Sequence, residues 1–121
     1  MASNKRILKK EIRMICGALA GECVIAKITV QGIDPEKLNE IIYELAELQY
    51  NALSRVNFDF PQSPKAFESA ATYNKARSAY FKAAYRKLKG EFNAHVEAIV
   101  KKMNEALPQA QKDANKAALK A

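Results

Sequence analysis

The sequence predicts an all-α protein, an antiparallel three-helix bundle whose third helix is long. Apolar residues recur at three- and four-residue steps through three stretches, the spacing of a buried helical stripe. The 121 residues include only 4 Gly and 4 Pro, and two of the prolines, Pro35 and Pro64, follow helix-capping residues. With 49% hydrophobic and 27% charged residues, the composition excludes a disordered chain and suits one domain over residues 1–121.

The first helix is predicted over residues 5–30, and Gly32 ends it. Its expected core stripe consists of Leu8, Ile12, Ile15, Leu19, Cys23 and Ala26. A second apolar stripe runs beside the first and consists of Ile7, Met14, Ala18, Gly21, Ile25 and Ile28. A helix that is apolar around so much of its circumference is typically covered from two sides.

The second helix is predicted over residues 34–56. Asp34 is a suitable cap, Pro35 suits the first helical position, and Glu36 suits the first turn. The short link to the first helix predicts that the two are antiparallel neighbours. Glutamates then recur along one side of this helix, at Glu40, Glu44 and Glu47, and this row is interpreted as a solvated face.

The third helix is predicted over residues 64–106, after a loop in which Phe58 and Phe60 are expected to cover one end of the bundle. Ser63 and Pro64 suggest the restart. The apolar register continues in phase across Gly90, although glycine costs about 1 kcal/mol relative to alanine there. The pattern favours one continuous helix, with four helices in total as the alternative if the chain breaks near Gly90.

A third helix of this length is much longer than the second. About 43 residues span roughly 64 Å, against about 34 Å for the second helix. We therefore expect its far end, around Val96, Ile99 and Met103, to overhang the bundle and to need a cover from a second copy. The remainder, residues 109–121, is predicted to be a frayed basic tail because it contains few apolar groups.

The two cysteines, Cys16 and Cys23, are predicted to be reduced and shielded. Seven helical residues separate them by about 10 Å along the axis, beyond the 7 Å or so that a disulfide tolerates between Cα atoms. We expect no signal peptide, because Glu11 and Arg13 interrupt the first apolar run. The longest apolar stretch, residues 14–30, contains Glu22 and Lys27 and is too short and too charged for a membrane span. The cytoplasm is the expected location.

No constellation in the sequence predicts catalysis, a metal or a cofactor. The single histidine, His95, follows Glu91 by one helical turn, but two ligands fall short of the three or four that a stable metal site needs. The cysteines lie among apolar residues, where a thiol is inert. Gly17 and Gly21 lie inside a helix, so they form no phosphate loop and instead favour close approach of a neighbouring helix. We therefore expect a protein that is not an enzyme.

Charge is distributed unevenly along the chain, whose net charge is +7. Residues 1–15 carry five basic residues and one acidic residue. Residues 16–60 carry three basic and seven acidic residues, and residues 61–121 carry twelve basic and five acidic residues. At about 100° per residue, four basic side chains of the third helix fall in one narrow stripe: Lys75, Lys82, Arg86 and Lys89. A second basic cluster opens the first helix and consists of Lys5, Arg6, Lys9, Lys10 and Arg13.

These observations predict a protein-interaction or self-assembly module that binds itself or another protein. The alternative is a basic nucleic-acid-associated protein that binds weakly and without sequence preference, because such stripes neutralise phosphates. A resemblance is carried by the opening stretch NKRILKKEIRMICGALAGEC, which is similar to the start of a family of small, uncharacterised bacterial helical proteins. The resemblance implies a compact helical fold and a bacterial cytoplasm, and it assigns no functional residue.

Overall fold

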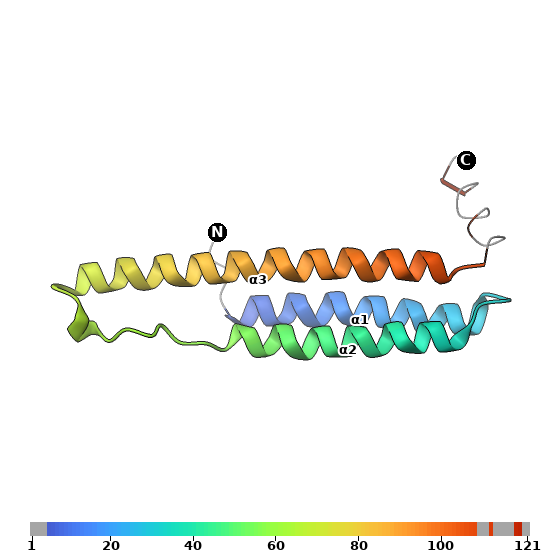
Figure 1. Ribbon diagram of the computed structural model, residues 1–121, viewed down its shortest axis with the longest axis horizontal. Coiled ribbons are helices and arrows are strands. Elements are labelled where there is room, and N and C mark those ends of the chain that lie inside the picture. The colour runs from blue at the N-terminus through green and yellow to red at the C-terminus, as the bar shows by residue number, and fades with distance from the viewer. Residues whose placement is uncertain (1–4, 109–111, 113–117, 120–121) are drawn as a thin grey trace.

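The computed structural model describes residues 5–108, 112 and 118–119 (Figure 1). These residues form an all-α bundle of three helices, α1 (Lys5–Thr29), α2 (Pro35–Val56) and α3 (Ala70–Ala106), with a short 3-10 turn, η1 (Pro64–Ala66), before α3. No strand occurs among the described residues, so the predicted fold class is confirmed. The prediction of a frayed tail at 109–121 lies outside the described residues, apart from 112 and 118–119.

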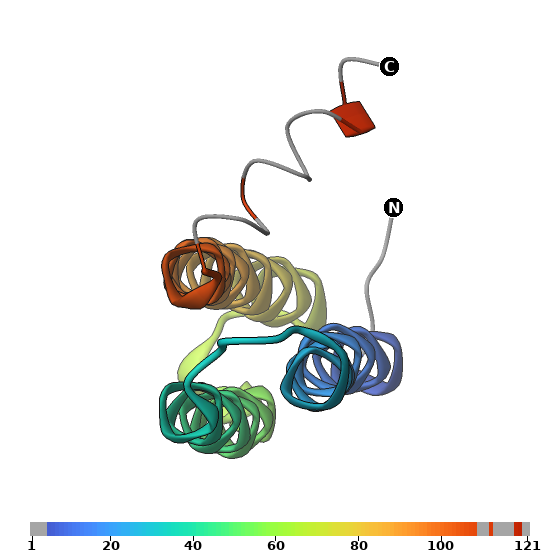
Figure 2. The same cartoon turned by 90° about the vertical axis from the view of Figure 1, so that its right-hand side faces the viewer.

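The helices run up, down and up, and end-on they form a triangle (Figure 2). The α1–α2 turn follows the sequence prediction: Gly32 adopts φ +78°, and Asp34 accepts a hydrogen bond of 3.0 Å from the Glu36 N–H. A left-handed φ of this kind favours glycine. α2 packs against both other helices, and Pro108 lies against Gly32 after the end of α3. The turn and the end of α3 therefore meet at the same end of the bundle.

One core joins the three helices. Its buried members are Leu8, Ile12, Cys16 and Cys23 of α1, Leu38, Ile41, Leu45, Leu48, Ala52 and Val56 of α2, and Leu88, Phe92 and Ile99 of α3. Ile15 was predicted to belong to the core stripe of the first helix. Its side chain is exposed, and Cys16 is buried in its place. Both residues flank the stripe on a helical wheel, and the lateral position of α2 decides between them.

α3 is continuous across Gly90, as the unbroken apolar register predicted. It begins at Ala70, however, and not at residue 64. The Ser63 side chain makes no capping hydrogen bond, so only η1 forms there. The chain then extends through Phe67, and Ser69 supplies the real cap by accepting from the Thr72 N–H at 3.2 Å.

The overhang of α3 lies at the opposite end from the one predicted. The prediction of an overhang around Val96, Ile99 and Met103 is wrong. Ile99 is fully buried, and Val96 and Met103 pack against the core. Instead the first turns of α3 project past α1 and α2, and the segment between α2 and α3 runs outward beside these projecting turns (Figure 1). The prediction assumed that α3 starts level with the end of α2, but the extended segment carries its start outward.

Aromatic rings hold this projecting end of α3. The predicted loop phenylalanines do not cover the end of the bundle and instead pack along α3. Phe58 lies 5.3 Å from the Phe81 ring and 5.3 Å from the Tyr85 ring, centroid to centroid. Phe60 lies 5.7 Å from Tyr73. Edge-to-face and offset pairs at these separations stabilise the contact beyond simple burial.

The cysteines give a prediction about reactivity. Both are free and buried, and burial raises the pKa of both thiols, with Glu22 adding to the effect at Cys23. The thiolate is the reactive form, and each thiol becomes accessible to a reagent only when the fold opens locally. We therefore expect thiol labelling of the native protein at pH 8 to be at least about 100-fold slower than labelling in denaturant. A chromogenic disulfide reagent measures both rates, and equal rates would contradict the buried placement.

The same pKa shift predicts a pH dependence of stability. A thiol whose pKa is raised by folding contributes fully to the free energy of unfolding at any pH below the pKa that the thiol has in the unfolded chain. The contribution is lost as the pH rises through the pKa of the folded state. The free energy of unfolding should therefore fall at alkaline pH, and the fall should shrink in a variant that carries Cys16→Ala and Cys23→Ala.

Candidate interaction surfaces

The side of α1 that faces away from the core is apolar and exposed. Its large side chains are Met14, Val24, Ile25 and Ile28, with exposed fractions of 62%, 46%, 60% and 78%. Three small residues lie between them, Gly17, Ala18 and Gly21, and all three are exposed. We call these seven residues the open face of α1. Single exposed apolar residues are ordinary on protein surfaces, but a continuous row is typical of an interaction site.

The two glycines of the open face have no neighbour in this chain. A Cβ added at Gly17 or at Gly21 would meet nothing within 4 Å. The close helix approach that this spacing predicted is therefore not made by α2 or α3. The expectation that α1 is covered from two sides is also wrong within the described chain, because only its core side is covered. The second apolar stripe predicted from the sequence included five of the seven residues of the open face. It omitted Gly17 and Val24, because these two lie at the edge of the stripe on the helical wheel.

The basic stripe predicted on α3 lies on the surface. Lys75, Lys82 and Arg86 are exposed and Lys89 is half-buried. Leu88, which is in the core, lies about 130° around the helix from the middle of the stripe. The stripe thus has the geometry that the helical spacing predicted.

The two basic clusters lie at the same end of the bundle, which sequence spacing alone did not indicate. The Lys5 ammonium lies 5.8 Å from the centroid of the Phe81 ring and 3.4 Å from the Phe58 carbonyl oxygen. Lys82 follows Phe81 directly. Lys5, the first member of the second basic cluster (Lys5, Arg6, Lys9, Lys10 and Arg13), therefore lies near the turn of α3 that carries Lys82.

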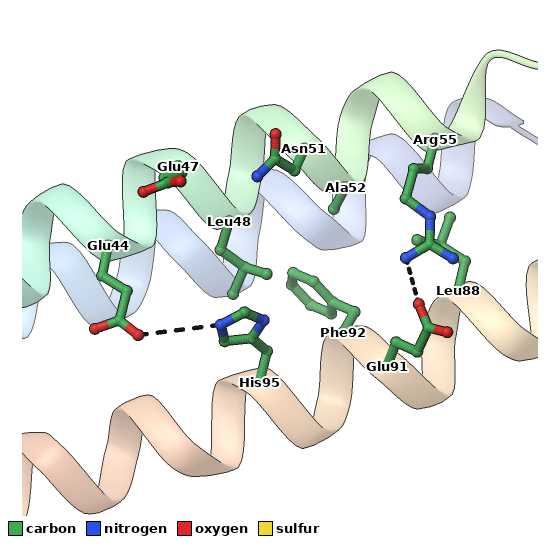
Figure 3. A pocket seen from close by; sticks show the side chains of 10 residues that line it. All are labelled: Glu44, Glu47, Leu48, Asn51, Ala52, Arg55, Leu88, Glu91, Phe92 and His95. Carbon is green, nitrogen blue, oxygen red and sulfur yellow. Dashed lines mark hydrogen bonds and ion pairs between the residues drawn. The ribbon is translucent and has the colours of Figure 1, made fainter.

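Two glutamates of the acidic row, Glu44 and Glu47, line an open groove between α2 and α3 (Figure 3). The row is therefore not entirely the solvated face that the sequence predicted, because Glu44 is half-buried and paired with α3. Glu44 lies 3.0 Å from the Lys102 ammonium and 4.0 Å from His95 Nε2, while Glu91 pairs with Arg55. His95 and Glu91 thus turn to partners on α2 and not to each other. Such exposed pairs contribute about 0–1 kcal/mol each and orient α3 against α2.

The groove has an apolar floor formed by Leu48, Ala52, Leu88 and Phe92. All four are buried and belong to the core shared by the three helices. Within residues 5–108, 112 and 118–119, no three His, Cys, Asp or Glu side chains lie close enough to hold a metal ion. The same residues contain no helix long and apolar enough to cross a membrane.

Comparison with protein-family models, with curated protein sequences and with solved structures found no match to this chain. The similarity of the opening stretch to small bacterial helical proteins stays a prediction. The functional argument therefore depends on the surfaces described above.

Proposed function

We propose that this protein is a non-enzymatic helical interaction module that associates, with itself or with a partner, through the open face of α1. The observation that carries the proposal is the row of exposed apolar side chains over two glycines that no part of the described chain approaches. A helix of a neighbouring molecule fits such a face, because small residues let two backbones approach closely. A reducing compartment such as the cytoplasm suits this function, since both thiols are free.

The apolar area supports a weak association. The four large side chains of the open face expose the equivalent of about two and a half complete side chains, each worth about 1.5–3 kcal/mol on burial. Two such faces together gain about 7–15 kcal/mol, against an association cost of about 4–15 kcal/mol. The two terms largely offset each other, so we expect weak association. A surplus of about 4–8 kcal/mol corresponds to a dissociation constant between about 1 μM and 1 mM.

Two charges on the open face should abolish association. Ile25 and Ile28 are exposed, so Ile25→Lys with Ile28→Lys should leave the fold intact. Burying the two ammonium groups in an interface should weaken binding by at least about 100-fold. Sedimentation equilibrium measures the change. The matched control is Tyr43→Lys with Tyr50→Lys, which adds the same charge at exposed apolar positions of α2 and should leave the mass unchanged. Equal effects of the two variants would contradict the proposal.

The second candidate function is binding of nucleic acid. It is favoured because the basic stripe of α3 and the second basic cluster of α1 lie at the same end of the bundle. Four basic residues carry this reading: Lys75, Lys82, Arg86 and Lys89. They supply charge without the amide side chains that read base edges, so binding would be weak and independent of sequence. Neutralising about four phosphates gives a slope of log affinity against log salt near −4.

A fourfold Lys/Arg→Gln variant of the basic stripe separates the two functions. For a nucleic-acid protein, wild type is retained on duplex DNA at low salt and the variant is not. For an interaction module, neither is retained. A change of mass without a change in DNA retention would make the stripe part of the assembly surface.

A further inference from the structure

We propose that the open face of α1 is occupied by the α1 of a second copy, antiparallel to the first, with a two-fold axis that passes beside Gly21. The inference rests on the proposed function and names its partner and geometry.

Spacing along the open face is that of a two-helix seam. Met14, Ala18, Gly21, Ile25 and Ile28 are separated by four, three, four and three residues. A repeat of 3.5 residues keeps a row facing a second helix along its whole length. Glu11 would be the next position toward the N-terminus, so the apolar seam begins at Met14. Its length to Ile28 is about 21 Å, and its middle residue is Gly21.

Residue size along the seam is self-complementary about Gly21. On the open face, the turn before Gly21 has two small residues, Gly17 and Ala18, and the turn after it has two large ones, Val24 and Ile25. In an antiparallel pair related by a two-fold axis, the same flank of each helix meets its mate. Val24 of one copy then lies over Gly17 of the other, and Ile25 lies over Ala18.

The ends and the centre of the seam fit the same arrangement. Met14 meets Ile28 of the other copy at both ends, which pairs two exposed large side chains. The two copies of Gly21 meet at the axis, where the absence of a side chain allows the backbones to approach. A parallel pair would instead place Ala18 on Ala18 and Ile25 on Ile25, so the small residues would face each other and leave a void at one end.

Charge favours the same orientation. The half of the bundle at the N-terminus of α1 (5–17, 46–56 and 82–94) carries ten basic and three acidic residues. The other half (18–45 and 95–106) carries four basic and seven acidic residues. An antiparallel pair sets the basic half of each copy beside the acidic half of the other. A parallel pair would set basic beside basic within about one Debye length, roughly 8–10 Å. This match is the reason to choose a second copy over a foreign helix.

Disulfide trapping tests the geometry. In the antiparallel pair, Ala18 of one copy lies beside Ile25 of the other. The two copies of Ala18 are about 9 Å apart along the helix axis, and the two copies of Ile25 are about 12 Å apart. Tagged Ala18→Cys chains mixed with untagged Ile25→Cys chains should form a mixed disulfide under mild oxidation. Each variant alone should not cross-link, because a disulfide needs Cα atoms within about 7 Å. Wild type controls for the buried native thiols.

A glycine substitution gives an independent measurement. Gly21→Leu meets open space within one chain, so it should leave the monomer folded. At the axis of a dimer it would hold the backbones apart and should weaken association by about 10- to 100-fold. Gly90→Leu is the matched control, because Gly90 also lies within a helix and faces open space, and it should leave the mass unchanged.

The outcomes separate this inference from the function on which it rests. A mixed disulfide together with loss of mass in Gly21→Leu supports the antiparallel pair. Cross-linking of either single variant alone, or a wild-type dimer that neither cross-links nor responds to Gly21→Leu, overturns the pairing and leaves the interaction module standing. A wild type that stays monomeric at about 500 μM, above the midpoint of the range expected, overturns self-association itself.

Discussion

Replacing Ile99 with alanine should lower the free energy of unfolding by about 2–5 kcal/mol. Ile99 is fully buried in the second half of α3 and belongs to the core shared by the three helices. Truncation removes apolar contacts and leaves a cavity that close-packed neighbours fill only in part. Chemical denaturation followed by circular dichroism measures the loss.

The neighbouring residue provides the control for Ile99. Val100 is 36% exposed and lies one position along the same helix. Val100→Ala should therefore change stability by less than about 1 kcal/mol, as surface substitutions usually do. Equal losses at Ile99 and Val100 would show that the end of α3 is uncovered in solution.

Replacing Phe58 with alanine should destabilise the projecting end of α3 by about 2–4 kcal/mol, somewhat below the range for a fully buried phenylalanine. Phe58 contacts three rings of α3, those of Tyr80, Phe81 and Tyr85. Without it the segment from 57 to 69 loses its main attachment, and local opening should increase.

Limited proteolysis measures the change at Phe58. Cleavage within residues 57–69 should become faster in Phe58→Ala, while cleavage within α2 should not. Asp59→Ala changes the adjacent exposed residue and should leave the digestion pattern as in wild type. A pattern that is unchanged in Phe58→Ala would contradict the ring cluster as the attachment.

The helices themselves were predictable because their signals are local. The Asp34-Pro35 start of α2 depends on one side chain and one ring, and both act within a single turn of helix. The continuity of α3 across Gly90 followed from a register maintained over many residues. Such periodicity outweighs the cost of one glycine, about 1 kcal/mol.

The position of α3 along the bundle was not predictable from its length. It depends on how far the segment between α2 and α3 extends before Ser69 caps the helix. That distance is set by contacts of Phe58 and Phe60 with rings of α3 more than 10 residues away in sequence. Local patterns do not contain this information, so the overhang was assigned to the wrong end.

The candidate surfaces divide in the same way. The basic stripe and most of the open face followed from helical spacing, because each lies on one helix. The exposure of Gly17 and Gly21 did not, since an intrahelical glycine pair predicts a close neighbour without saying which molecule supplies it. The meeting of Lys5 with Phe81 likewise required the packing of α1 beside α3.

The central claim is that the open face of α1 is a self-association surface, and the mass of the wild-type protein in solution tests it most directly. Sedimentation equilibrium from about 1 μM to 1 mM covers the range of dissociation constants expected from the exposed apolar area. The account predicts a mass that rises from the 13.5 kDa of one chain toward twice that value, at low and at moderate salt. A mass of 13.5 kDa at every concentration would contradict it.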